Sequence, residues 1–321
     1  MTVDDGRWMG AALALASRGR GFTDPNPSVG CVIVRNGLVV GRGWTQPGGR
    51  PHAEAMALAE AGPAAEGATA YVTLEPCAHV SPRGPACADL LGAAGIGRVV
   101  IAHIDPDPRT HGRGAARIGN AIFLDARAAD AARTMEGFLT RLAYGRPHVT
   151  LKLATSLDGG IALASGESRW ITGARARAHA HLERARTGLI VVGRGTLEAD
   201  EPRLDVRLPG LECRTPRRAV LTAGGAAPEG WIALPSPAAV ADAGTDHVLV
   251  EGGAGAAAAF LEEDLVDRLL LYRAPILIGG ARPALGDIGL TALAEAHGRW
   301  RLRDARMLGS DRLEVYERVR N

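Results

Sequence analysis

The sequence predicts two α/β domains that meet near residue 146. Its 321 residues exceed what one hydrophobic core usually fills. Strand and helix patterns alternate in both halves, and this alternation is typical of α/β layers. Gly145, Arg146 and Pro147 interrupt the pattern between a helical stretch and a new strand. We therefore place the first domain over residues 1–146 and the second over residues 147–321.

The first half opens with apolar residues at helical spacing from Met9 to Ala16. Two β-rich runs then meet at Asn36-Gly37, the dipeptide most typical of a two-residue hairpin turn. After the hairpin, helix formers alternate with short apolar runs of strand character. The expected strands cover residues 70–74 and 98–104, and the expected helices cover residues 52–62, 87–95 and 125–144.

The second half repeats the alternation of strand and helix without repeating the sequence of the first half. The expected strands cover residues 148–154, 188–195, 217–222, 247–253, 266–277 and 311–319. The expected helices cover residues 175–186 and 253–264. Because the two halves differ in sequence, we expect them to have different roles.

Composition excludes several classes of protein. Hydrophobic residues make up 46% of the chain and charged residues 22%, which excludes wholesale disorder. A net charge of +2 with 4% aromatic residues gives little support to nucleic-acid binding. Four cysteines are too few for a disulfide framework, and the N-terminus lacks the apolar core of a signal peptide. We expect a cytoplasmic protein with neither a membrane nor a nucleic-acid partner.

The most informative residues are His52, Glu54, Cys77 and Cys87. One imidazole and two thiolates suit zinc, and three protein ligands leave a fourth position for a catalytic water. Glu54 would take a proton from that water and pass it to a leaving amine. The order H-x-E followed by P-C is typical of zinc nucleobase deaminases, although there the cysteines are separated by two residues and here by nine.

Each of these residues alone has a structural interpretation: Cys77 as a core thiol, His52 as a helix cap and Glu54 as a solvated helix residue. A purely structural zinc site would need a fourth protein ligand, for which His79 is the nearby candidate. We interpret the remaining thiols, Cys31 and Cys213, as structural.

A second motif, EGGAGAAAAF, follows an expected strand and opens an expected helix. Backbone N–H groups at such a junction bind the phosphates of dinucleotides. The alternative is a tight strand-to-helix junction that needs small residues. We predict a phosphate cradle here rather than a complete Rossmann fold, because little chain follows the motif.

The strings PNPSVGCVIVRNG, PHAEAMAL, GATAYVTLEPCAH, KLATSLDG, SGESRWIT and EGG occur in this order over nearly the whole chain. Together they resemble the bifunctional deaminase/reductase of riboflavin biosynthesis. The resemblance implies a cytidine-deaminase-like three-layer sandwich followed by a dihydrofolate-reductase-like α/β domain. It also implies zinc-dependent deamination of a diamino-hydroxy-phosphoribosylaminopyrimidine, followed by NADPH-dependent reduction of the ribosyl group to ribityl.

Further site residues follow from this resemblance alone. In the deaminase half it implies substrate contacts at Asn26, His79 and Arg83. In the reductase half it implies substrate contacts at Ser168, Arg184, Leu204, Arg207 and Glu251. The implied NADPH contacts are Ala154, Trp170, Thr196, Asp200, Gly253, Ala254, Gly255, Ala256, Ala257, Ala258 and Ala259.

Some positions depart from the family pattern. Thr45 stands where the family usually has a substrate-facing histidine, and Ala78 stands where serine is usual. Lys152 and Asp158 are further candidates, with a strand-end ion pair as their structural interpretation. The alternative function is a nucleoside or tRNA deaminase with a non-catalytic second domain. Homo-oligomerisation and the choice between NADPH and NADH are left open by the sequence.

Overall fold

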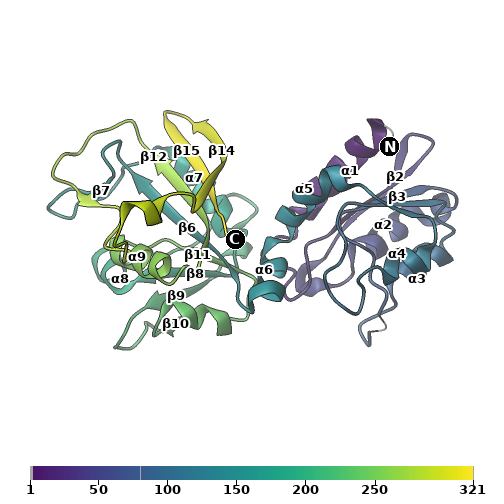
Figure 1. The fold of residues 1–321 in the computed structure, drawn as a ribbon, viewed down its shortest axis with the longest axis horizontal. Coiled ribbons are helices and arrows are strands. Elements are labelled where there is room, and N and C mark those ends of the chain that lie inside the picture. The colour runs from purple at the N-terminus through teal and green to yellow at the C-terminus, as the bar shows by residue number, and fades with distance from the viewer. Residues whose placement is uncertain (1–2, 80, 321) are drawn as a thin grey trace. The chain divides into compact units, whose positions relative to one another are not determined.

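The computed structural model describes residues 3–79 and 81–320. The chain divides into two compact units, Met1–Gly145 and Arg146–Asn321, each with its own sheet and hydrophobic core (Figure 1). Each unit is described by itself below. The division of the two activities at residues 146 and 147 stays a prediction.

The first unit contains six helices and five strands within its described residues. In chain order they are α1 (Val3–Ala16), β1 (Gly30–Arg35), β2 (Leu38–Trp44), α2 (Ala53–Ala61), β3 (Thr69–Val72), α3 (Cys87–Ala93), β4 (Arg98–Ile101), α4 (Arg113–Ile118), β5 (Ala121–Phe123), α5 (Ala128–Thr134) and α6 (Glu136–Tyr144). The sheet has the order β2-β1-β3-β4-β5. Strand β1 is antiparallel to β2 and β3, and β3, β4 and β5 are parallel.

The expected hairpin is present, because β1 and β2 are joined by Asn36 and Gly37. Both residues have positive φ, 51° and 74°, as a type I′ turn requires. This turn fixes the register in which Arg35 pairs with Leu38.

Helices cover both faces of this sheet, and glycines let them approach closely. A Cβ on Gly30 would lie 1.9 Å from the Ala12 carbonyl oxygen of α1, and one on Gly43 would lie 2.1 Å from the Ala53 carbonyl oxygen of α2. Gly43 pairs with Cys31, which points to the face opposite Gly30. Helices α1 and α2 therefore lie on opposite faces, and the unit is a three-layer sandwich (Figure 1).

The second unit contains three helices and ten strands within its described residues. They are β6 (His148–Thr155), β7 (Gly160–Ala162), α7 (Ala174–Arg184), β8 (Leu189–Gly193), α8 (Arg194–Asp200), β9 (Arg217–Leu221), β10 (Trp231–Leu234), β11 (His247–Val250), α9 (Ala254–Glu262), β12 (Val266–Arg273), β13 (Arg282–Pro283), β14 (Trp300–Leu308) and β15 (Asp311–Arg318).

The main sheet of this unit has eight strands in the order β10-β9-β8-β11-β6-β12-β15-β14. The first six are parallel, and β15 and β14 are antiparallel to their neighbours. Strands β6, β11, β8 and β9 therefore end at one edge, which we call the carboxyl edge. Ligands of open α/β sheets bind at such edges.

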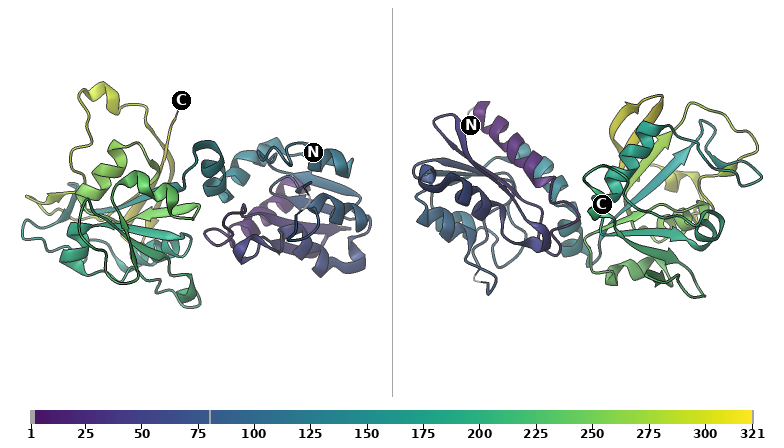
Figure 2. Two further views of the ribbon diagram at one scale, coloured as in Figure 1. Left: turned by 90° about the horizontal axis from the view of Figure 1, so that it is seen from below. Right: turned by 180° about the vertical axis from the view of Figure 1, so that it is seen from behind.

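Helices α7 and α9 cover opposite faces of the main sheet (Figure 2). Residues Ala176 and Ala180 of α7 pack with Ala154, whereas Phe260 of α9 packs with Leu153. Ala154 and Leu153 are adjacent on β6 and point to opposite faces. The face beneath α7 is therefore the face that carries Ala154.

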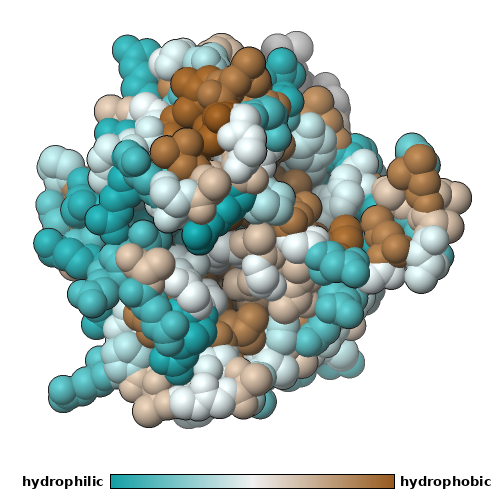
Figure 3. Space-filling view, turned by 90° about the vertical axis from the view of Figure 1, so that its left-hand side faces the viewer, coloured by the Kyte–Doolittle hydropathy of each residue, from teal (hydrophilic) through white to brown (hydrophobic). Residues whose placement is uncertain are grey.

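No helix within residues 3–79 and 81–320 has the length and apolarity needed to cross a bilayer. Exposed apolar side chains do occur, and Leu277 and Leu293 are the most exposed. On the face drawn in Figure 3, apolar residues gather in patches among hydrophilic ones. Exposed apolar residues of this kind are common on folded proteins.

Candidate active sites

The first candidate site lies where α2 and α3 begin. His52 is the N-cap residue of α2, Cys87 is the first residue of α3, and Cys77 follows β3. The Nδ1 atom of His52 lies 3.3 Å from the Sγ atom of Cys87 and 3.7 Å from the Sγ atom of Cys77. The spacing read from the sequence thus brings these three ligands together within 4.8 Å of one another.

The donor set fits zinc. One imidazole nitrogen and two buried sulfurs are ligands that zinc prefers, and the backbone N–H of Cys87 donates to the Sγ atom of Cys77 at 3.3 Å. Hydrogen bonds from the Cys87 thiol and His52 lower the pKa of Cys77, which favours its thiolate form. Among the described residues, no fourth histidine, cysteine or carboxylate joins the group. Three protein ligands would leave a fourth position for water, as in catalytic zinc sites.

Glu54 lies in the first turn of α2 with its side chain 3% exposed. Burial raises the pKa of its carboxyl, and the neighbouring His52 partly offsets this effect. A buried carboxyl beside the three metal ligands is placed to exchange a proton with a water bound there.

The second candidate site lies along the carboxyl edge of the main sheet. Arg184, the last residue of α7, donates from Nε and Nη2 to the two carboxylate oxygens of Glu251, at 2.7 and 2.8 Å. The Nζ atom of Lys152 lies 3.8 Å from the same carboxylate. Burial alone would raise the pKa of Glu251, but Arg184 and Lys152 lower it to about 2. Glu251 is therefore ionised at neutral pH.

The turn before α9 lies at the same edge and has features of a phosphate cradle. The N–H of Gly253 donates to the Oγ1 atom of Thr196 at 3.0 Å, which joins the start of α9 to α8. The next N–H groups belong to the first helical turn, where no intrahelical acceptor exists. A Cβ on Gly255 would meet no atom within 4 Å, so the space beside these donors is open. The turn fits the diphosphate of a dinucleotide.

Comparisons with known proteins decide the family. The cytidine and deoxycytidylate deaminase zinc-binding region matches residues 2–103, and the RibD C-terminal domain matches residues 147–230 and 238–313. The Escherichia coli riboflavin biosynthesis protein RibD is 37% identical over 361 residues, covering 96% of this chain and 98% of that protein. The chain belongs to the RibD family. It is a bifunctional enzyme of riboflavin biosynthesis, with a deaminase domain followed by a reductase domain.

Other RibD relatives and structures agree over the whole chain. The Mycobacterium tuberculosis RibD protein (strain H37Rv) is 39% identical, covering 95% of each chain. The Acinetobacter baumannii RibD structure matches with a TM-score of 0.86 at 36% identity, covering 98% of this chain and 99% of that one. A Thermotoga maritima structure, a diaminohydroxyphosphoribosylaminopyrimidine deaminase/5-amino-6-(5-phosphoribosylamino)uracil reductase, matches with the same TM-score at 28% identity and the same coverage. The predicted family and fold class are confirmed.

The substrate residues predicted for the RibD deaminase domain have varied surroundings. The amide nitrogen of Asn26 lies 3.2 Å from the Nε2 atom of His52, so Asn26 orients this imidazole. The Nδ1 atom of His79 lies 3.4 Å from the Oγ1 atom of Thr110, outside the ligand group. Arg83 is exposed and donates to the Gly48 carbonyl oxygen at 2.6 Å.

Thr45, where the RibD pattern usually has histidine, is buried and has a structural role. Its Oγ1 atom accepts the N–H of Val29 at 3.0 Å, at the end of the hairpin. The threonine hydroxyl therefore stabilises the backbone at this position.

Sequence reasoning missed Glu75, which organises the loop beside the metal ligands. Its buried carboxylate accepts the N–H groups of Ala115 and Gly112 at 3.0 Å each, and that of Asp105 at 3.2 Å. The sequence did offer a signal for Glu75, because it is an acidic residue at the end of the apolar run before Pro76-Cys77. A carboxylate buried there needs hydrogen-bond donors, such as these backbone N–H groups.

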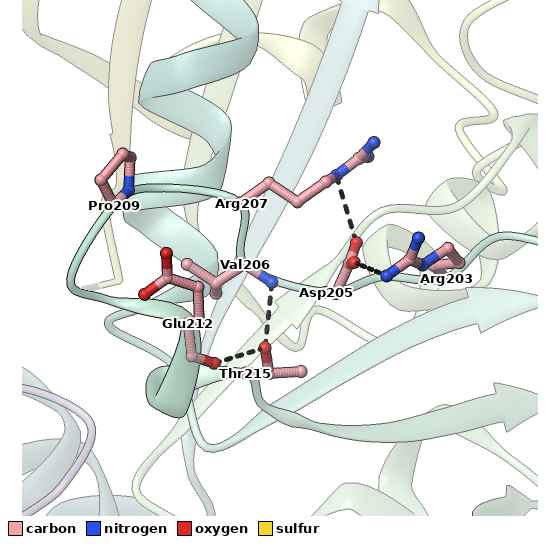
Figure 4. Close-up of a pocket in the computed structure, with 7 residues that line it drawn as sticks. All are labelled: Arg203, Asp205, Val206, Arg207, Pro209, Glu212 and Thr215. Atoms are coloured by element: carbon pink, nitrogen blue, oxygen red, sulfur yellow. Dashed lines mark hydrogen bonds and ion pairs between the residues drawn. The ribbon is translucent and has the colours of Figure 1, made fainter.

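One predicted residue of the RibD reductase domain, Arg207, lies at an open hollow of about 490 Å³ (Figure 4). Arg207 lines it and pairs with Asp205 at 3.2 Å, and Arg203 pairs with the same carboxylate at 2.8 Å. The side chain of Leu204 is buried among apolar residues, so only its backbone is available to a ligand. Ser168 is half-buried in the segment before α7.

The predicted cofactor residues divide into backbone and side-chain candidates. The side chains of Ala256, Ala257 and Ala258 are buried against the sheet, which leaves their backbone for contacts. Trp170 is 66% exposed and lies beneath the guanidinium of Arg177. The remaining predicted contacts, Ala154, Asp200, Ala254 and Ala259, are half-buried.

Lys152 and Asp158 do not form the ion pair considered from the sequence. Lys152 is oriented by Glu251, as described above. Asp158 accepts the Ser156 hydroxyl at 2.5 Å and the N–H of Gly279 at 2.8 Å. Asp158 therefore fixes a loop, while Lys152 belongs to the carboxyl edge.

Proposed function

We propose that the first unit removes a ring amine from a diamino-hydroxy-phosphoribosylaminopyrimidine by hydrolysis. The second unit then reduces the ribosyl group of the product to ribityl, with zinc serving the first reaction and NADPH the second. The observation that carries this proposal is the convergence of His52, Cys77 and Cys87 beside the buried Glu54. The Thermotoga maritima relative, whose name gives these two activities, supports the choice of substrate.

Zinc would be held by the Nδ1 atom of His52 and the Sγ atoms of Cys77 and Cys87. Bound zinc acts as a Lewis acid that makes its water a nucleophile at neutral pH. Glu54 takes the proton of the attacking water and returns it to the departing amine. The carbon–nitrogen bond breaks, a carbonyl replaces the amine, and the nitrogen leaves as ammonia.

The loops around the metal ligands bind the substrate. Asn26 presents its amide to the pyrimidine ring beside His52, and His79, held near Thr110, contacts another part of the substrate. Arg83 carries an exposed guanidinium that pairs with the phosphate of the substrate. These contacts place the amine that leaves at the water activated by Glu54.

In the second unit, NADPH supplies the hydride for the ribosyl carbon. Glu251 is ionised at neutral pH, so it acts as an acceptor that holds Arg184 and Lys152 in place rather than as a proton donor. Arg207 presents its exposed guanidinium to the hollow in Figure 4, where it pairs with the substrate phosphate. Ser168, Leu204 and Glu251 complete the proposed substrate contacts.

The test is mass analysis of the products that purified protein forms from this pyrimidine, with and without NADPH. We expect deamination alone without NADPH and the ribityl product with it. Glu54→Gln should keep its zinc and lose deamination by about a hundredfold to ten-thousandfold, because an amide cannot exchange the proton. The same variant should still reduce pre-deaminated substrate.

Two results would contradict the proposal. Loss of reduction in the Glu54→Gln variant would show that the two reactions do not use separate sites. Deamination of cytidine or of tRNA in preference to the phosphorylated pyrimidine would restore the alternative function. That alternative is not favoured, because RibD relatives match both halves of the chain.

A further inference from the structure

Arg194 is a basic residue at the carboxyl edge whose charge is only weakly balanced. It is the first residue of α8, directly after β8. Its Nη2 atom donates to the Ala226 carbonyl oxygen at 3.0 Å, and Nε and Nη2 lie 3.4 and 3.3 Å from the Oγ1 atom of Thr222. Both acceptors are neutral. The nearest carboxylate is that of the exposed Glu198, 3.8 Å away.

The loop after β9 holds this guanidinium close to its backbone. Gly225 has a positive φ of 96°, and a Cβ there would lie 3.2 Å from the Nη2 atom of Arg194. A Cβ on the neighbouring Gly224 would meet no atom within 4 Å. Within the described residues, the Nη1 atom of Arg194 has no hydrogen-bond or ion-pair partner. The site therefore offers a fixed cation with an unused donor.

Strand order gives the direction of a bound dinucleotide along the carboxyl edge. The reducing end must face the proposed substrate residues Arg184 and Glu251, whose ion pair lies beside Lys152 of β6. The diphosphate fits the turn at Gly253, which follows β11. Because the order is β6, β11, β8 and β9, the adenosine half then extends past the ends of β8 and β9. Arg194 and Thr222 lie at those two ends.

We propose that Arg194 binds the 2′-phosphate of the adenosine half of NADPH and so makes this unit prefer NADPH to NADH. The proposal rests on the proposed reductase function and answers a question that the sequence left open. A guanidinium donates two parallel hydrogen bonds to a phosphate. The ribose of NADH carries a neutral hydroxyl at the same position and gains much less from this cation.

The geometry also assigns a role to Glu198. Its carboxylate competes weakly for Arg194 and adds a negative charge beside the phosphate position. Glu198→Gln should therefore tighten the binding of NADP⁺, in the direction opposite to the loss of Arg194. A residue needed only for folding would not produce this opposite effect.

The experiment is calorimetric titration of the full-length protein with NADP⁺, NAD⁺ and adenosine 2′,5′-bisphosphate. Arg194→Ala should weaken NADP⁺ and the bisphosphate by about 10- to 100-fold, the usual effect of losing hydrogen bonds to a charged group. The affinity for NAD⁺ should stay unchanged. Arg194→Lys should be intermediate, because lysine keeps the charge and loses the planar fork. Arg301→Ala, which removes an exposed arginine on β14, is the matched control and should change nothing.

The outcomes separate this proposal from the one on which it rests. Wild-type protein that binds neither nucleotide would contradict the reductase function itself. Wild-type protein that binds both nucleotides equally would overturn the role of Arg194 alone. Equal losses of NADP⁺ and NAD⁺ in both Arg194 variants would show a structural role and overturn it as well. Unchanged binding of adenosine 2′,5′-bisphosphate by Arg194→Ala would also overturn the role of Arg194.

Discussion

Arg146 and Asp267 form a two-point ion pair at the start of the second unit. The Nη1 and Nη2 atoms of Arg146 donate to the two carboxylate oxygens at 2.8 and 2.9 Å. Asp267 also accepts the N–H of Val149 at 2.8 Å and a guanidinium proton of Arg320 at 2.5 Å. Burial opposes the charge of this carboxylate, but Arg146 lowers its pKa below the usual range. The residue after Gly145 is thus part of the second unit.

A fragment that begins at Tyr144 should fold without the first unit, because Arg146 keeps its partner. In this fragment, Arg146→Met should lower the free energy of unfolding by at most about 3 kcal/mol, since Arg320 still pairs with Asp267. Urea unfolding at pH 7 measures the difference. Arg301→Met, at an exposed pair, is the control and should cost less than about 1 kcal/mol. Equal losses in the two variants would contradict a special role for Arg146.

Glu251→Gln in the same fragment should show a pH-dependent loss of stability. The pKa of Glu251 is lowered to about 2 in the folded protein, against about 4.3 for an unperturbed glutamate. A carboxyl whose pKa is lowered by folding stabilises the folded state at every pH above its pKa in the unfolded chain. This contribution disappears as the pH falls from about 4.3 toward 2. We expect the variant to be less stable by about 3 kcal/mol at pH 7. The difference should shrink below about pH 4.5 in urea titrations, and a difference that grows there would refute the assignment.

Local patterns in the sequence predicted much of the fold. The Asn36-Gly37 turn was predictable because two adjacent residues determine its backbone. Strand β14 was missed because both of its faces are largely exposed, so no alternation of apolar residues marks it. Its pairing with β15 is a tertiary property, and α8 was similarly hidden in a short polar stretch.

The candidate sites also contain both residues that local sequence patterns predict and contacts that only tertiary packing creates. The grouping of His52, Cys77 and Cys87 was predictable because residue types that suit zinc occur in the order of the deaminase motif, and their role as ligands stays a prediction. The ion pair between Arg184 and Glu251 was not predictable, although both residues were expected to contact the substrate. They are 67 positions apart and meet because the last residue of α7 lies beside the residue that follows β11. Contacts that tertiary packing creates between distant residues cannot be predicted from their spacing in the sequence.

The zinc content of cysteine variants tests the choice of ligands. Purified protein should hold close to one zinc per chain, and Cys77→Ser or Cys87→Ser should lose most of it because each removes one of three ligands. Cys31→Ser should keep its zinc, since Cys31 is a buried core residue and is not one of the three grouped ligands. Metal analysis by mass spectrometry gives the count. Retention of zinc by both the Cys77 and Cys87 variants would show that the ligands are wrongly assigned.

Cys213→Ser serves as the second control in that series. Cys213 is exposed and lies in the other unit, so its loss should leave zinc binding and deamination unchanged. Loss of zinc from this variant would place the metal in the second unit and reverse the assignment.

Gly255→Val should weaken NADP⁺ binding by about tenfold or more without unfolding the protein. Gly255 is the second residue of α9, and its Cβ position is free of contacts within 4 Å. A valine there creates no clash and has a higher helix propensity than glycine, so stability should not fall. Its methyl groups would occupy the space beside the first N–H groups of the helix and hold a phosphate away from them.

Two glycine variants make this result interpretable. Gly252→Val would bring a Cβ within 2.5 Å of the Ala256 side chain and should lower the melting temperature, which Gly255→Val should not do. Gly92→Val changes a helical glycine with equally open surroundings in the first unit and should leave NADP⁺ binding unchanged. Calorimetry and thermal unfolding on the three full-length variants separate the effects. If Gly255→Val binds NADP⁺ as tightly as the wild type, the diphosphate does not lie at the start of α9, and the strand-to-helix turn is only a tight junction.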